Sequence, residues 1–255
     1  MNIKKCIAAI LKNASIKIIF FLTQIFFVFN GCTQNSSLSD VNLDDPSLIK
    51  PDIFINKSIT SNSITFTNAT WLLDKNDNSI ELKSGSVSMN KITMTVKHSF
   101  NNAPYYTFEN MDILPFQLNT TYESEITLSD GTVYKSTVTT REKDLYQLNV
   151  PAELNKNQDL NLSWADAAND MDLELTMVLT GHKDTTNYLD VYKFKISNPL
   201  SGKYTIPDSY YINRPELSQA QLTLEAINTG QINKSFMNGS NITSTLSITR
   251  NVNLK

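Results

Sequence analysis

The sequence predicts an all-β protein, and three observations carry that prediction. After residue 51, apolar and polar side chains alternate with a period of two in many short segments, which is typical of half-buried strands. Turn signals such as Asp130-Gly131 and Asn238-Gly239 separate these segments. No segment after the N-terminal leader keeps the 3.6-residue period of an amphipathic helix. We therefore expect strands joined by tight turns.

The strands are expected where the alternation is clearest. Asp130-Gly131 lies between two such segments and predicts a type I′ hairpin. The alternating segments are 91–97, 122–128, 160–164, 173–179, 192–196, 222–226 and 246–248.

The number of strands predicts two β-sandwich domains in tandem. About a dozen strands over some 200 residues exceed one seven-stranded sandwich and fit two of about 100 residues each. The charged stretch 141–144 follows a complete hairpin and precedes a new apolar start at Leu145. This places domain 1 at residues 52–144 and domain 2 at residues 145–255. One larger sandwich or barrel is the alternative.

Residues 1–31 have the composition of a targeting leader. They carry four lysines and no acidic residue, and two apolar runs, 18–22 and 25–29, follow those lysines. The runs are shorter and more broken than the roughly 20 apolar residues of a spanning helix. The segment ends at Gly31-Cys32 and becomes polar at once. It resembles a bacterial lipoprotein signal, which implies that residues 1–31 are a signal peptide and that Cys32 is lipidated. Phe29 and Asn30 depart from the usual pattern of such signals.

The cysteine count agrees with this interpretation. The chain has two cysteines, Cys6 inside the leader and Cys32 at its end. A chain cleaved before Cys32 therefore has no internal disulfide and no cysteine-based metal site. Residues 32–51 are rich in Ser, Asn and Asp and show no periodicity, so we expect a flexible tether there.

Part of each half resembles a fibronectin type III or immunoglobulin-like domain. The stretch 116–122 leads into a hairpin and places Tyr122 where those domains carry the tyrosine-corner residue. In the second half, residues 159–164 resemble the early strand that carries a buried core tryptophan, here Trp164; Trp71 is the weaker counterpart in the first half. The resemblance implies immunoglobulin-like sandwiches used as spacers, adhesins or subunits of assemblies. A fold alone does not specify a function.

The densest acidic cluster is the candidate metal site. Asp166, Asp170 and Asp172 lie just after Trp164, and Glu174 follows in the next strand. Calcium binds closely spaced carboxylate and carbonyl oxygens, so this loop is a calcium candidate. It lacks the glycine and bidentate glutamate of the twelve-residue EF-hand loop. A solvated acidic turn explains the same residues, and no other cofactor is expected.

No catalytic motif is recognisable in the sequence. His98 continues the apolar face of segment 91–97, which indicates a packed strand-end residue, and His182 falls in an expected turn. Neither has the partners of a known catalytic motif. Each of the doublets Tyr105-Tyr106 and Tyr210-Tyr211 should place one ring in the core. Their other rings are candidates for a glycan or protein contact.

The expected function is a non-enzymatic binding or scaffolding lipoprotein of the bacterial cell envelope, held on the outer membrane or the cell surface. Its expected partners are the membrane, through the lipid, and a protein or glycan. The formal net charge of −3 argues against nucleic acid. A glycan-binding lipoprotein of an uptake complex and a calcium-stabilised adhesin stay open as alternatives, and an enzyme is the third.

Overall fold

The computed structural model describes residues 36–40, 42–142, 144–145, 147–165 and 172–255. The regular structure in these ranges is β-strand, apart from single turns of 3₁₀-helix, so the predicted all-β fold is confirmed. Within the same ranges, no helix is both long and apolar enough to cross a membrane.

A nine-stranded sheet runs through the whole molecule, and we call it the long sheet. Its first strand, β1 (Lys50–Ile59), pairs in parallel with its last strand, β16 (Asn241–Leu254), and the short β10 (Glu153–Leu154) also pairs in parallel with β16. The other pairs of the sheet are antiparallel. In spatial order the strands are β13 (Thr186–Ile196), β12 (Asp172–Lys183), β15 (Leu217–Thr229), β16 (Asn241–Leu254), β1 (Lys50–Ile59), β2 (Ile64–Leu73), β6 (Pro104–Thr107) and β5 (Thr95–His98), with β10 (Glu153–Leu154) paired to the end of β16.

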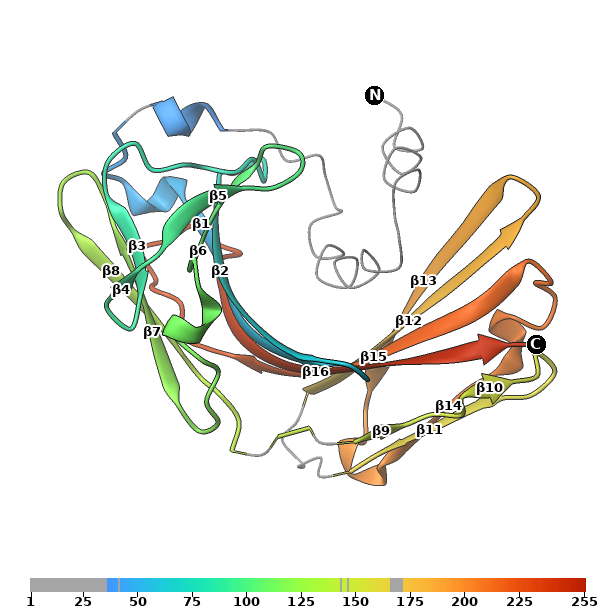
Figure 1. Ribbon diagram of the computed structural model, residues 1–255. Coiled ribbons are helices and arrows are strands. Elements are labelled where there is room, and N and C mark those ends of the chain that lie inside the picture. Colours follow the sequence, from blue (N-terminus) through green and yellow to red (C-terminus); the bar gives the residue numbers. More distant parts are fainter. Residues whose placement is uncertain (1–35, 41, 143, 146, 166–171) are drawn as a thin grey trace.

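Two small sheets complete two sandwich halves. Figure 1 shows one small sheet beside each end of the long sheet, which curves between them. The sheet of the first half contains β4 (Ile92–Thr93), β3 (Ser86–Met89), β7 (Thr121–Thr127) and β8 (Val133–Thr139). The sheet of the second half contains β14 (Lys203–Ile206), β11 (Leu160–Trp164) and β9 (Leu148–Asn149).

Each half encloses its own hydrophobic core. In β12 the alternating side chains Leu173, Leu175, Met177 and Leu179 are all buried, as the period of two predicts. The second core contains these residues and Trp164, whose indole Nε1 donates to the Pro199 carbonyl at 2.9 Å. The predicted core tryptophan of the second half is thus confirmed.

The first core contains the tyrosine corner that the sequence predicts. Tyr122 is fully buried, and its hydroxyl donates to the Pro115 carbonyl at 2.7 Å. The same hydroxyl accepts a hydrogen bond from the Gln117 backbone N–H at 2.8 Å. Burial raises the pKa of this phenol. The two bonds hold the segment before β7 against the strand, which is the role of the corner in immunoglobulin-like sandwiches.

The two cores separate the chain into halves, whereas the long sheet continues across both halves. One core draws most of its residues from the chain before residue 139, and the other begins at Leu145. Phe236 and Ile242, late in the chain, nevertheless belong to the first core. The sheet also continues across the boundary, because β1 pairs with β16 from Asp52–Asn241 to Ile59–Ile248. The division into residues 52–144 and 145–255 therefore stays a prediction.

An ion pair lies at the boundary between the two halves, and close contacts join them there. Lys57 on β1 pairs with Asp144, and these side chains are 14% and 7% exposed. The Arg141 guanidinium donates to the Ile227 carbonyl at 2.7 Å. Beside it, Gly230 packs so closely on β8 that a Cβ would lie 2.1 Å from the Thr137 carbonyl oxygen. The halves are thus in close contact along β8 and β15.

The hairpin at Asp130-Gly131 is present, but its turn is not type I′. Gly131 has φ +82°, whereas Asp130 is not in the left-handed region. A type I′ turn needs positive φ at both central residues. The Gly131 N–H instead bonds to the Leu128 carbonyl at 3.0 Å, and the Leu128 N–H bonds to Thr132. This is a three-residue loop with glycine at the left-handed position, the next commonest hairpin connection.

The flexible tether predicted for residues 32–51 is wrong for its described part. Short 3₁₀ turns occupy η3 (Ser37–Asp40) and η4 (Pro46–Leu48), and β1 begins at Lys50. Leu43 and Ile49 are buried in the first half. Leu43 and Ile49 are spaced widely enough to escape a periodicity search, yet both lie in the core, whereas Leu48 is 41% exposed.

Candidate functional site

Most of the predicted site residues lie outside the described residues. These are Cys32, Asp166 and Asp170; only Asp172 of the calcium candidate is described, exposed at the start of β12. Glu174 lies two residues further on, with its Oε1 2.9 Å from the Lys193 ammonium. Where the chain is described, no three His, Cys, Asp or Glu side chains gather as metal ligands would. Calcium binding therefore stays a prediction.

The two histidines lie in different halves and have separate partners. His98 is exposed at the end of β5, with its Nε2 3.1 Å from Glu81 Oε2. The expected packing of His98 is wrong because the chain passes from one sheet to another between β4 and β5, which interrupts the apolar face. His182 is exposed but lies near the end of β12, in register with Asn187, and not in the turn where it was expected. Its Nδ1 lies 2.9 Å from Asn187 Oδ1.

Both tyrosine doublets place one ring in a core, as predicted. Tyr106 and Tyr211 are buried, while Tyr105 and Tyr210 are partly exposed. The Tyr106 hydroxyl accepts from the Leu82 N–H at 2.7 Å, and burial raises the pKa of Tyr106 to about 12. Tyr210 packs edge-on against two other aromatic rings of the second half. Tyr105 belongs to a different arrangement on the long sheet.

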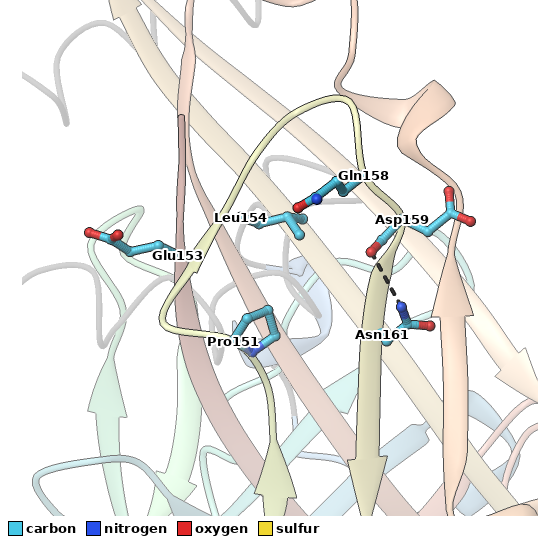
Figure 2. Close-up of a pocket in the computed structure, with 6 residues that line it drawn as sticks. All are labelled: Pro151, Glu153, Leu154, Gln158, Asp159 and Asn161. Carbon is cyan, nitrogen blue, oxygen red and sulfur yellow. Dashed lines mark hydrogen bonds between the residues drawn. The ribbon is translucent and has the colours of Figure 1, made fainter.

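A hollow of about 560 Å³ opens between β10 and β11 in the second half (Figure 2). Three of its polar side chains have partners in neighbouring segments. Glu153 pairs with Lys255, Asp159 accepts from the Asp208 N–H at 3.0 Å, and Asn161 accepts from Thr205 at 2.7 Å. These contacts hold the surrounding loops together, so the hollow carries no functional assignment.

Three aromatic rings stack on the face of the long sheet that points away from the first core. Trp71 lies between Phe54 and Tyr105, with ring centroids 5.1 Å apart on both sides and interplanar angles of 21° and 18°. These are offset stacks. On β1 the core side belongs to Ile53 and Ile55, so Phe54 faces the other way.

Trp71 is therefore no counterpart of the buried Trp164, and this part of the resemblance is wrong. Its neighbour Leu72 occupies the core position of β2. The alternation of residues 69–73 is obscured because Ala69, Thr70 and Leu72 are all buried, on both faces of the strand.

Two of the rings, Trp71 and Tyr105, belong to a row that also contains charged and amide side chains, which we call the outer row. Asp52 stands opposite both Asn241 and Trp71 in the strand register, and Tyr105 stands opposite Lys97. Burial raises the pKa of Asp52, against the lowering effects of the Lys50 charge and of the Asn241 hydrogen bond. The outer row consists of Asn241, Asp52, Trp71, Tyr105 and Lys97, from five neighbouring strands.

Two carboxylates stand opposite each other on the same sheet in the second half. Glu225 on β15 pairs in register with Glu174 on β12. Burial and the charge of Glu174 raise the pKa of Glu225 to about 7, and Lys193 opposes that shift. Two like charges directly opposite destabilise a sheet, so one proton held at Glu225 relieves the repulsion.

The outer row is the arrangement that the sequence did not reveal. Its five residues are spread from position 52 to position 241, and the parallel β1–β16 pair brings the two ends together. The alternation within each strand could have suggested that Phe54 and Trp71 share a face. Nothing in the sequence indicated that Asn241 would join them.

Comparisons with known proteins assign no family to this chain. No protein-family profile matches the chain, and no curated protein matches it. Among solved structures, the chain is similar to the FN1–FN3 domains of chicken CNTN1, with 11% identity and a TM-score of 0.22 over 80% of this chain and 66% of that one. It is also similar to the Yersinia pseudotuberculosis adhesin InvE, with 13% identity and a TM-score of 0.21 over 78% of this chain and 58% of that one. At these TM-scores the likenesses carry no argument about what this chain binds.

Proposed function

We propose that this protein is a lipid-anchored binding module of the bacterial cell envelope, non-enzymatic, held at the outer membrane or cell surface by Cys32. The lysine-rich apolar leader that ends at Gly31-Cys32 supports the anchor. An acylated N-terminal cysteine carries more than one chain, which suffices for stable attachment.

The outer row is the observation that supports binding. Trp and Tyr are the residues that dominate the energetics of protein interfaces, and here they stand beside a carboxylate, an amide and an ammonium group. Both faces of the Trp71 ring are covered by Phe54 and Tyr105. A glycan would stack on open ring faces, so a protein partner is the version we propose.

The anchor is tested by labelled palmitate. Cells that express the wild-type chain should incorporate label into it, and the Cys32→Ala variant should lose that label. Incorporation that is equal in the two proteins would remove the lipoprotein assignment.

The binding face is tested by capture of envelope proteins in mild detergent. Lys97→Glu reverses the charge at the end of the outer row while leaving the ring stack in place, and Trp71→Ala removes the centre of the stack. Leu200→Ala, at an exposed site in the second half, is the matched control. Proteins retained by the wild type and by Leu200→Ala but lost from both row variants would support the proposal. Equal retention by all four proteins would contradict it.

A further inference from the structure

The described chain begins very near the proposed lipid. Only three residues separate Cys32 from Ser36, and an extended chain spans at most about 14 Å over those four Cα-to-Cα steps. Ser36 is already fixed on the first half. Its hydroxyl donates to Asp74 at 2.7 Å, and its backbone N–H donates to the Ser79 carbonyl at 2.8 Å. A lipid on Cys32 would therefore hold this end of the first half close to the membrane surface.

A single residue connects this end of the chain to the hairpin between β5 and β6. The Glu81 backbone N–H donates to the Ser39 hydroxyl at 2.8 Å, and the Glu81 carboxylate lies 3.1 Å from the His98 ring at the end of β5. Figure 1 shows the first described residues and β5 at the same end of the molecule. The hairpin is thus a neighbour of the proposed attachment point.

The hairpin presents an aromatic side chain on a well-defined turn. Phe100 is 65% exposed, the highest value among the large hydrophobic side chains that the structure describes. The Ser99 N–H bonds to the Ala103 carbonyl at 3.0 Å, and the Asn102 N–H bonds back to Ser99 at 2.9 Å. These bonds define the turn that carries Phe100.

We propose that the β5–β6 hairpin docks on the membrane that holds the Cys32 lipid, with the Phe100 ring at the level of the lipid headgroups. An exposed aromatic ring at the tip of a hairpin suits this boundary, because the ring leaves water there. This inference rests on the proposed lipidation of Cys32. The lipid and Phe100 would then be two contacts that fix the first half against the bilayer, instead of a single flexible attachment.

The test places an environment-sensitive NBD fluorophore on the lipidated full chain. A Phe100→Cys variant in a Cys6→Ser background has one reactive thiol, because acylation blocks Cys32. A Leu200→Cys variant, labelled at a position that is 53% exposed in the second half, is the matched control. Both proteins are bound to phosphatidylcholine–phosphatidylglycerol vesicles that carry a headgroup nitroxide.

The label at position 100 should be quenched at least about two-fold more than the label at position 200, and its emission should shift to the blue. Equal quenching at the two positions in protein that floats with the vesicles would overturn the docking and leave the anchor standing. Failure of the protein to float, or flotation that Cys32→Ala does not abolish, would refute the anchor itself.

Discussion

Removal of the Lys57 ammonium should destabilise the junction between the two halves more than any surface charge does. Lys57→Met keeps a linear apolar stem and removes the charge. It leaves the buried Asp144 carboxylate with a hydrogen bond from the Leu145 N–H, at 3.0 Å. Loss of one member of a buried ion pair costs about 3–5 kcal/mol, and since Lys57 keeps some exposure we expect about 3 kcal/mol.

The measurement is urea unfolding at pH 7 of the full chain in mild detergent, followed by tryptophan fluorescence. Lys135→Met is the control, because Lys135 is half exposed and its pairs with Glu123 and Glu125 lie on the surface. Such pairs contribute about 0–1 kcal/mol. The double variant Lys57→Met/Asp144→Leu removes both charges and should recover most of the lost stability. A loss from Lys57→Met no larger than that from Lys135→Met would refute the reasoning.

Three further predictions concern the core, the sheet and the junction. Tyr122→Phe removes two buried hydrogen bonds and should lower the free energy of unfolding in urea by about 1–3 kcal/mol. Tyr134→Phe, at a partly buried tyrosine of the first core, should lower it by less than about 0.5 kcal/mol. Equal losses would contradict the tyrosine corner. The pKa of Glu225 is raised to about 7 in the fold, so the folded chain holds a proton there that the unfolded chain releases near pH 4.5. This residue's contribution to stability therefore falls as the pH rises between these values. Glu225→Gln should flatten that part of the stability–pH curve, and an unchanged curve would show that Glu225 titrates normally. Gly230→Ala would force a Cβ against Thr137 and Val138 and should cost about 1–3 kcal/mol, with faster amide exchange in β8. As the control, Gly131→Ala meets no neighbouring atom and should cost about 1 kcal/mol through its positive φ. A Gly230→Ala protein as stable as the wild type would contradict the close contact.

The parts of the fold that the sequence predicted are those that depend on neighbouring residues. Alternation along residues 173–179 is enough to assign β12, because a strand repeats its side-chain direction every two residues. Tyr122 and Trp164 were found because each lies in a local pattern with a fixed offset from its strand. The turn at Asp130-Gly131 was located correctly but given the wrong type, because the same dipeptide fits a two-residue and a three-residue loop.

The parts that the sequence did not predict depend on partners far along the chain. Leu43 and Ile49 show no period because they fill places in a core built by later strands. The outer row depends on the parallel pairing of β1 with β16, which joins residues nearly 190 positions apart, as in Asp52 and Asn241. No local signal encodes such a pairing, since it is selected by the burial of both strands.

The sequence by itself determined that this is a strand-built protein whose first 31 residues are lysine-rich and apolar and are followed by a cysteine, because composition and periodicity are properties of adjacent residues. Only the tertiary structure decided that two cores share one long sheet and that the supposed tether packs down from Ser36 onward. The same structure brought Asp52, Trp71 and Tyr105 into one row. Those outcomes follow from which surfaces find each other in three dimensions, and side-chain burial is their common cause.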